Sequence, residues 1–135
     1  MSDWFEVDLR VRYAETDQMG VVYYANHLVW FEMARTELFR SMGIEYSRLE
    51  TEREIFLPVA EAYCRYRFPL RYDDEVAVRV KIKEIGTIRL SFEYEILKNG
   101  KAAATGYTNH AFVDRSGRPV PVPVDIREAM DRLRR

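Results

Sequence analysis

The residues with the clearest capacity for chemistry lie in the stretch YAETDQMGVVYY, residues 13–24. Within it, Asp17 stands between the end of an alternating segment and the start of a helical one, close to Gly20 and just before a Val-Val pair. Burial beside apolar groups would penalise the charged carboxylate, whereas nearby backbone N–H groups would stabilise it. The local sequence leaves two interpretations open: Asp17 organises a turn, or it is held near a helix start for catalysis.

The helix predicted to begin near residues 24–26 offers a second chemical feature. The first N–H groups of a helix have no partner within it, and the helix dipole adds about half a positive charge at this end. A substrate carbonyl directed at these groups would have its developing oxyanion stabilised by about 3 kcal/mol. A carboxylate close by, such as that of Asp17, could then attack the carbonyl carbon or activate a water molecule.

Motifs for other chemistries are missing from the sequence. It contains no GxSxG elbow, P-loop, glycine-rich dinucleotide fingerprint or Cys-His metal cluster. One cysteine and two histidines are poor material for a zinc site, and Cys64 is predicted to be a buried structural thiol. His27 is interpreted as a structural histidine or as a hydrogen-bond partner of an acyl group or of the loop. A net charge of −1 and a pI near 6.2 argue against nucleic acid or an anionic membrane as a partner.

The elements that must position these groups follow two periodicities. A period of two over residues 5–13 predicts a half-buried strand. A helical period over residues 26–42, apolar on nearly all sides, predicts a long helix wrapped by other elements. Asn26 is the predicted N-cap of this helix and Gly43 its C′ residue. Residues 44–55 carry only a weak helical pattern and predict a short helix or a loop.

Strand patterns dominate the second half of the sequence. Four runs have the composition or alternation of strands: residues 56–68, 76–82, 88–96 and 101–113. The dipeptide Asn99-Gly100 predicts a tight hairpin turn between the last two. After a proline-punctuated turn, the sequence from residue 124 onward predicts a short C-terminal helix, with Asp125 and Glu128 as a capping box.

These elements predict an α+β fold for a single domain of residues 1–135: a curved antiparallel sheet of about five strands around one long helix, with a short C-terminal helix. Such a sheet leaves an edge strand and part of one face uncovered, so we expect a homo-oligomer formed through strand pairing. The N-terminus lacks the features of a secretion signal, and no apolar run approaches the ~20 residues that insert across a membrane. We therefore expect a soluble, cytoplasmic protein.

The segment RYAETDQMGVVYYANHLVWFEMARTELFRSMG resembles the opening of the 4-hydroxybenzoyl-CoA thioesterase family of hotdog-fold proteins. Members share a Y-x-[DE]-T-D-x-x-G-x-[VL]-[YF] pattern followed by a long apolar helix, and the similarity extends more weakly to the last strand. The residues that match the pattern are Tyr13, Glu15, Thr16, Asp17, Gly20, Val22 and Tyr23. The resemblance implies a hotdog fold and hydrolysis of an acyl-CoA substrate without a metal or redox cofactor.

The resemblance also implies roles for individual residues. It assigns the catalytic carboxylate, as nucleophile or general base, to Asp17 and the amide that polarises the thioester to the neighbourhood of Tyr24. Many members carry His where this sequence has Tyr24, and Tyr where it has His27, so the side-chain roles at these two positions depart from the family pattern. The implied substrate contacts, with coenzyme A phosphates held by the two arginines, are Gly20, Val22, Tyr23, Pro58, Thr87, Arg89 and Arg118.

Two other functions remain open from the sequence. A hotdog hydratase or dehydratase of acyl thioesters pairs His with Asp or Glu, which Asp17 and His27 could imitate, although the Y-x-E-T-D-x-x-G context argues against it. A non-catalytic module that binds acyl-CoA or acyl-carrier protein would use the same fold without turnover. The sequence does not set the acyl group, the carrier, or whether the oligomer is a dimer or a tetrameric dimer of dimers.

Overall fold

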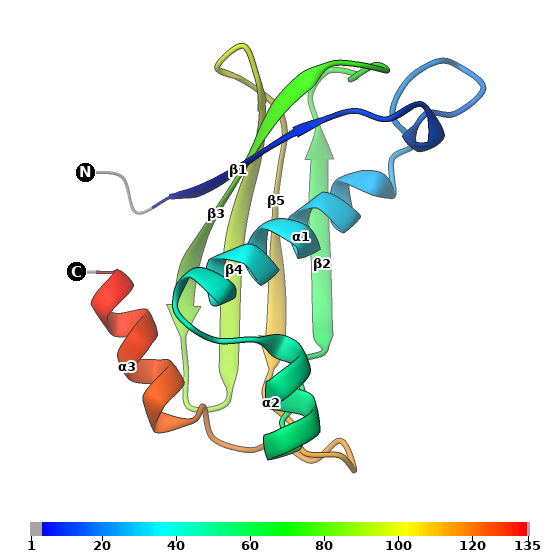
Figure 1. Ribbon diagram of the computed structural model, residues 1–135. Coiled ribbons are helices and arrows are strands. Elements are labelled where there is room, and N and C mark those ends of the chain that lie inside the picture. The colour runs from blue at the N-terminus through cyan, green and yellow to red at the C-terminus, as the bar shows by residue number, and fades with distance from the viewer. Residues whose placement is uncertain (1–3, 135) are drawn as a thin grey trace.

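The computed structural model describes residues 4–134 and contains one antiparallel sheet curved around a long helix (Figure 1). The strand order is β1-β3-β4-β5-β2, and all neighbouring strands are antiparallel. In chain order the elements are β1 (Phe5–Arg10), a 3-10 turn (Tyr13–Glu15), α1 (Asn26–Ser41), α2 (Tyr46–Arg53), β2 (Val59–Tyr66), β3 (Glu75–Ile85), β4 (Arg89–Lys98), β5 (Lys101–Ala111) and α3 (Val124–Leu133). The predicted α+β architecture is confirmed, and the weak pattern after α1 forms the short helix α2.

The first strand is shorter than its alternation predicted. Backbone hydrogen bonds to the segment before β3 continue as far as Val11, whose N–H donates to the Asp74 carbonyl at 2.9 Å. The next N–H, that of Arg12, donates instead to the Glu15 carboxylate at 2.8 Å, and the chain leaves the sheet there. Tyr13, the last residue of the predicted strand, is therefore exposed in a turn.

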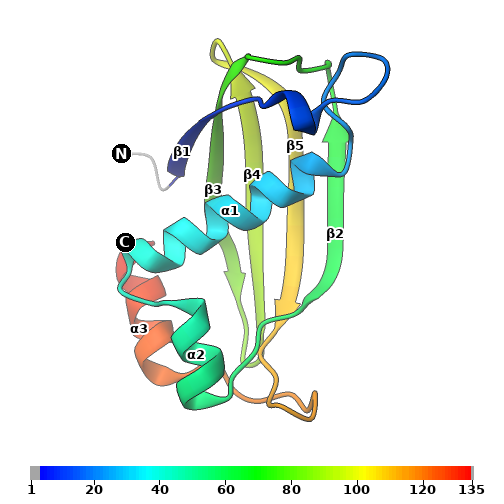
Figure 2. The same cartoon turned by 45° about the vertical axis from the view of Figure 1, so that its right-hand side comes forward.

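The core lies between α1 and the concave face of the sheet (Figure 2). Phe31 of α1 is fully buried and stacks on Tyr94 of β4, with ring centroids 4.2 Å apart. Gly106 of β5 makes room for this ring, because a Cβ atom at that position would lie 2.7 Å from Phe31 Cε2. Burying a large apolar side chain contributes about 1.5–3 kcal/mol, so α1 is held firmly against the strands.

The ends of the elements test the predicted caps. Gly43 follows α1 with a φ of +82°, and both residues of the Asn99-Gly100 turn have positive φ, so these two predictions are confirmed. The prediction of Asn26 as N-cap is wrong: Ala25 occupies that position, and the Asn26 side chain donates to the Glu15 carbonyl at 2.8 Å. The predicted capping box of α3 is also wrong, because the Asp125 carboxylate instead accepts hydrogen bonds from Arg53.

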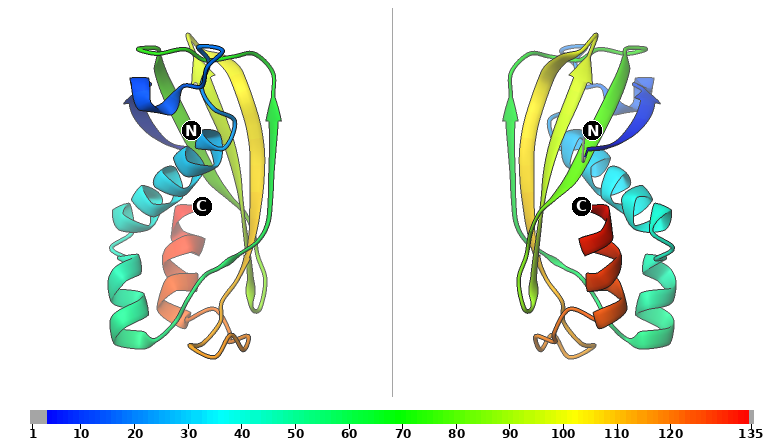
Figure 3. Two further views of the ribbon diagram at one scale, coloured as in Figure 1. Left: turned by 90° about the vertical axis from the view of Figure 1, so that its right-hand side faces the viewer. Right: turned by 90° about the vertical axis from the view of Figure 1, so that its left-hand side faces the viewer.

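All three helices lie on the same side of the sheet (Figure 3). The helices α2 and α3 lie at one end of the strands, together with the turn between β3 and β4, whereas residues 13–25 lie at the other end, beside the start of α1 (Figure 1). Among residues 4–134, no helix is long and apolar enough to cross a membrane. The fold thus separates the predicted chemistry of residues 13–27 from the C-terminal half of the predicted site.

Candidate active site

Residues 13–25 fold into a small hairpin that precedes α1. An isolated antiparallel bridge joins Thr16 to Val22, and the Asp17 N–H donates to the Val21 carbonyl at 2.9 Å. The tip is closed by Gly20, whose φ of +79° favours glycine and whose N–H donates to the Asp17 carbonyl at 2.9 Å. The hairpin therefore holds Asp17 in a fixed turn at the end of the sheet.

The carboxylate of Asp17 is half-buried and has one bonded oxygen. Its Oδ1 accepts the Met19 N–H at 2.9 Å, the usual bond of an aspartate that closes a turn. Within residues 4–134, no group donates a hydrogen bond to Oδ2. Asp17 lines an open depression of about 900 Å³ together with Gly20 and Tyr23, so a carboxylate oxygen can reach a bound molecule.

The backbone N–H groups of the two residues that precede α1 are free. The residues described by the structure provide no backbone hydrogen-bond acceptor for the N–H of Tyr24 or of Ala25. Each belongs to a peptide unit whose carbonyl is fixed: the Tyr23 carbonyl accepts the Asn26 N–H at 2.9 Å, and the Tyr24 carbonyl accepts the Tyr66 hydroxyl at 2.8 Å. These donors are held rigidly at the positive end of the helix dipole, as oxyanion stabilisation requires.

His27 is the second residue of α1 and is 4% exposed. Its Nδ1 is 3.0 Å from the Tyr24 carbonyl, and because a carbonyl can only accept, Nδ1 carries the hydrogen and Nε2 is an acceptor. Burial lowers the pKa of His27, which favours this neutral form. The ring meets Tyr66 edge-on and lines a depression of about 310 Å³ with Val22 and Tyr24. No described residue bonds Nε2, which leaves it available to a ligand.

The remaining predicted contacts separate into two groups. Val22 and Tyr23 lie in the hairpin, beside the two depressions that Asp17 and His27 line. The others lie at the far end of the sheet in the same chain. Pro58 precedes β2, Thr87 and Arg89 lie at the β3–β4 turn, and Arg118 lies in the segment after β5. A single chain therefore does not bring the predicted phosphate-binding arginines to Asp17.

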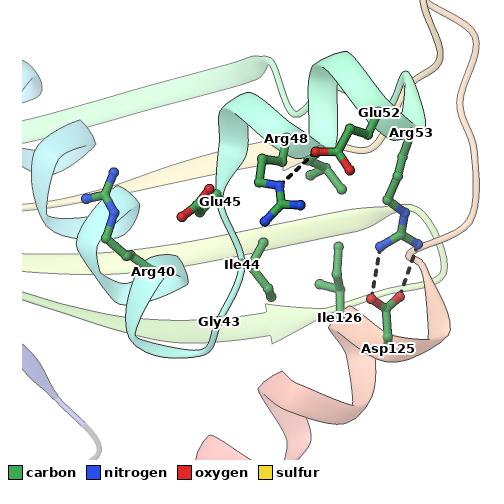
Figure 4. A pocket seen from close by; sticks show the side chains of 10 residues that line it. Arg40, Gly43, Ile44, Glu45, Arg48, Glu52, Arg53, Asp125 and Ile126 are labelled. Carbon is green, nitrogen blue, oxygen red and sulfur yellow. Dashed lines mark hydrogen bonds and ion pairs between the residues drawn. The ribbon is translucent and has the colours of Figure 1, made fainter.

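A groove between α2 and α3 is the most highly charged depression of the far end (Figure 4). Its arginines are paired with acids: Arg53 with Asp125 at 2.9 Å, Arg48 with Glu52 at 2.7 Å, and Arg40 with Glu37. These pairs are exposed, where each contributes little to stability. The groove carries no surplus of positive charge for an anion. In residues 4–134, no cluster of His, Cys, Asp and Glu is arranged to hold a metal ion.

One residue of the site escaped the sequence analysis. Glu15 entered it only as a position of the motif, yet its carboxylate is buried and bonded to Trp30 of α1 at 2.9 Å. The contact joins residues 15 apart in the chain. Because it depends on how the hairpin docks against α1, the spacing of the sequence contains no signal for it.

Comparison with known proteins gives consistent matches over nearly the whole chain. The family model described as "Thioesterase-like superfamily" matches residues 11–130. The chain is 28% identical to the acyl-CoA thioesterase YbgC of Haemophilus influenzae over 135 residues, which cover 99% of each protein. It is also 28% identical to the 1,4-dihydroxy-2-naphthoyl-CoA hydrolase of Thermosynechococcus vestitus over 115 residues, covering 84% of this chain and 79% of that protein.

Solved structures support the same relationship. The DHNA-CoA thioesterase of Staphylococcus aureus superposes with a TM-score of 0.91 and 29% sequence identity. The superposition covers 97% of this chain and 91% of that one. The match therefore includes the sheet, the central helix and the hairpin before it.

Proposed function

The chain belongs to the thioesterase-like superfamily, and from that premise we propose that it hydrolyses the thioester bond of an acyl-CoA, releasing a free acid and coenzyme A. The observation that carries the proposal is the pair of free N–H groups of Tyr24 and Ala25, next to the hairpin that holds Asp17. A thioester is already an activated acyl group. Carbonyl polarisation and one carboxylate are therefore sufficient chemistry, and no metal or redox cofactor is needed.

In the proposed reaction, the thioester carbonyl oxygen accepts the Tyr24 N–H, which stabilises the charge that develops on this oxygen. The Asp17 carboxylate acts in one of two ways. As a general base it takes a proton from water while the water oxygen attacks the carbonyl carbon. As a nucleophile it attacks the carbon itself, and water then hydrolyses the mixed anhydride. In both routes the C–S bond breaks and coenzyme A leaves as a thiolate that takes up a proton.

The acyl group would occupy the depression lined by Val22, Tyr24 and His27. Its walls include the rings of Tyr24, Tyr66 and Phe68, which suit an aromatic or a short aliphatic acyl chain. The free Nε2 of His27 would accept a hydrogen bond from a hydroxyl group on the substrate. The relatives named above include hydrolases of dihydroxynaphthoyl-CoA, whose acyl groups carry such hydroxyls.

We further propose that two copies pair through β2, the edge strand whose residues are almost all exposed. Glu61 and Arg65 lie two residues to either side of Tyr63 on the outer face of β2. An antiparallel pairing with its two-fold axis at Tyr63 brings each Glu61 opposite Arg65 of the partner subunit. This pairing gives partners to the backbone N–H and C=O groups of an edge strand that a lone copy leaves open to aggregation.

The same pairing would complete the substrate site. With the axis at Tyr63, Pro58 of the partner subunit comes opposite Phe68, which lines the depression beside Tyr24 and His27. The far end of one sheet, with Thr87, Arg89 and Arg118, then approaches the hairpin of the other. In this arrangement the arginines of one copy bind the coenzyme A phosphates of a thioester cleaved by Asp17 of the other. A second pairing of dimers would give the tetramer.

A charge exchange tests the pairing. Arg65→Glu creates two like-charged contacts per dimer and should shift the protein toward monomer in sedimentation equilibrium, with loss of activity. Glu61→Arg alone should do the same. The double variant Glu61→Arg with Arg65→Glu restores opposite charges and should recover both the dimer and the activity. A double variant that dissociates as readily as the single ones would exclude this register.

The activity itself is tested with a panel of thioesters: benzoyl-, phenylacetyl-, hydroxybenzoyl- and short- to long-chain aliphatic CoA, and the matching acyl-carrier proteins. Thiol release measured with a disulfide reagent identifies hydrolysis, whereas loss of enoyl absorbance from an unsaturated substrate would identify a hydratase. Binding without turnover across the panel would identify a binding module and refute the proposal. A single turnover in oxygen-18 water then separates the two roles of Asp17, because only the nucleophilic route transfers an unlabelled enzyme oxygen to the acid.

A further inference from the structure

We propose that Glu15 is a positioning residue, which locks the hairpin carrying Asp17 to the start of α1 through Trp30 and Asn26. The inference rests on the proposed thioester hydrolysis, since it concerns the geometry of that same site. It adds a residue that touches no reacting atom but sets the spacing between the carboxylate of Asp17 and the free N–H of Tyr24.

The side chain of Glu15 joins the hairpin to the helix. Its Oε1 accepts the Arg12 N–H at 2.8 Å, and its Oε2 accepts the indole N–H of Trp30 at 2.9 Å. Glu15 is 7% exposed and Trp30 2% exposed, so the bond between them is shielded from water. The Arg12 guanidinium lies 3.5 Å from Oε2 at the rim. The carboxylate thus connects the base of the hairpin to the second turn of α1.

The backbone of Glu15 makes a second set of connections. Its carbonyl accepts the Tyr23 N–H at 2.9 Å and the Asn26 side-chain amide at 2.8 Å. Tyr23 precedes the free Tyr24 N–H and Asn26 begins α1, so the chain on each side of the two free N–H groups is bonded to one residue. Asp17 follows Glu15 by two residues on the first strand of the hairpin. The position of Glu15 therefore affects both the Asp17 carboxylate and the free N–H groups of Tyr24 and Ala25.

The electrostatics of Glu15 favour the charged form. Burial alone would raise its pKa, but the hydrogen bonds from the Arg12 N–H, the Trp30 indole and the Arg12 side chain together hold the pKa below its usual value. A buried charge is costly, and an apolar side chain of similar volume often serves stability equally well. The carboxylate adds specific geometry, because it holds the Arg12 N–H and the Trp30 indole N–H at fixed distances from each other.

Two substitutions test the lock: the first keeps the volume of the side chain, and the second keeps an aromatic ring of smaller size. Glu15→Gln offers one acceptor and one NH₂ group, so one of the two donors must face another donor. Trp30→Phe removes the indole donor and keeps a ring. We expect kcat to fall about 10- to 100-fold in Glu15→Gln and about 10-fold in Trp30→Phe, the range of a lost charge-assisted hydrogen bond, with KM changed less than about threefold.

The double variant provides the specific signature. With Phe at position 30, the NH₂ group of the introduced Gln no longer faces an indole N–H, so kcat should be no lower than in Glu15→Gln alone. Matched controls exist elsewhere in the chain: Trp4→Phe on the outer face of the sheet and Glu52→Gln in the exposed ion pair of α2. Both should keep kcat within about twofold of wild type.

Hydrogen exchange gives a readout that does not depend on activity. In both Glu15→Gln and Trp30→Phe, the bonded N–H groups of Asp17, Val22 and Tyr23 should exchange faster, while those of β4 keep their protection. If the variants lower the melting temperature but keep kcat within about twofold, Glu15 is only structural and the proposal is overturned. If the wild-type chain cleaves no thioester, the proposed hydrolysis fails. Faster exchange confined to the hairpin would then still support the lock, and unchanged exchange would overturn it.

Discussion

Each end of the sheet has a buried histidine and an aspartate that closes a turn. At the loop end, residues 13–27, these are His27 and Asp17; at the turn end, residues 110–118, they are His110 and Asp114. Each aspartate accepts the N–H two residues further on at 2.9 Å. Because the residue types, burial and turn type are alike, a comparison of the two ends shows what distinguishes the proposed active site from a structural turn.

The difference lies in the hydrogen-bonding capacity left over. His110 uses both ring nitrogens, Nε2 with the Thr108 hydroxyl at 2.8 Å and Nδ1 with the Leu57 carbonyl at 3.3 Å, whereas His27 uses only Nδ1. The aspartates differ less: Asp114 Oδ1 accepts a second N–H, from Arg118 at 3.0 Å, whereas Asp17 Oδ1 accepts only that of Met19. Polar groups that are fully bonded rigidify a fold. Groups that are fixed but only partly bonded are available to a substrate.

The largest effect should come from exchanging each turn aspartate for asparagine. Asp17→Asn removes the proposed base or nucleophile and should lower kcat about 100- to 10,000-fold with little change in folding. Asp114→Asn makes the same chemical change in the same kind of turn and should leave kcat within about twofold. Both are measured by thiol release at saturating substrate. Equal activities of the two variants would remove the distinction between the ends and refute the role of Asp17.

The second effect concerns stability, and it should appear at the turn end. Burial, reinforced by the positive charge of Arg35, lowers the pKa of His110 from 6.5 to about 4. As pH falls below 6.5, the unfolded chain binds a proton on this residue before the folded chain does, so the free energy of unfolding decreases. Between pH 7 and pH 5 the loss from His110 is about 2 kcal/mol.

Replacement of this histidine by a residue that does not titrate isolates its contribution. His110→Gln should be less stable at pH 7, because the buried network with Thr108 is disturbed, but its stability should change less between pH 7 and pH 5. Urea unfolding at a series of pH values measures both quantities. His27 remains in the variant and contributes equally to both curves. A variant with the same pH dependence as wild type would contradict the assigned shift.

Features that depend on neighbours in the chain could be predicted from the sequence, whereas features that depend on distant partners could not. The period of two and the helical period depend on neighbours in the chain, and they predicted α1 over residues 26–42, where it spans Asn26–Ser41. The two wrong caps failed for a non-local reason. The Asn26 side chain bonds Glu15, 11 residues away, and Asp125 bonds Arg53, 72 residues away. Such partners appear only when the fold brings distant segments together.

The residues of the candidate site also fall into those that local sequence predicts and those that depend on distant contacts. The turn around Asp17 and the donors near Tyr24 follow from local sequence and from the family pattern, and the structure puts them in one hairpin. The support from Glu15 through Trp30 depends on tertiary packing and could not be inferred. Arg89 and Arg118 lie at the turn end of the same chain. In the proposed dimer their relation to Asp17 involves a second copy, and the sequence of one chain does not reveal how two copies pair.

The smallest effect should separate the two histidines by selectivity. His27→Phe keeps an aromatic ring but removes the Nε2 acceptor, so the preference for hydroxybenzoyl-CoA over benzoyl-CoA should fall about 2- to 10-fold, the value of one neutral hydrogen bond. The preference is the ratio of the two kcat/KM values. In His110→Gln, where the original ring uses both nitrogens for bonds to Thr108 and Leu57, this ratio should stay at the wild-type value. Because burial lowers the pKa of His27, the wild-type ratio should also hold as pH falls to 6.5 and decline only in more acidic solution, where protonation converts the acceptor into a donor. A ratio that is unchanged in His27→Phe would mean that His27, like His110, serves only to hold its own end of the sheet together.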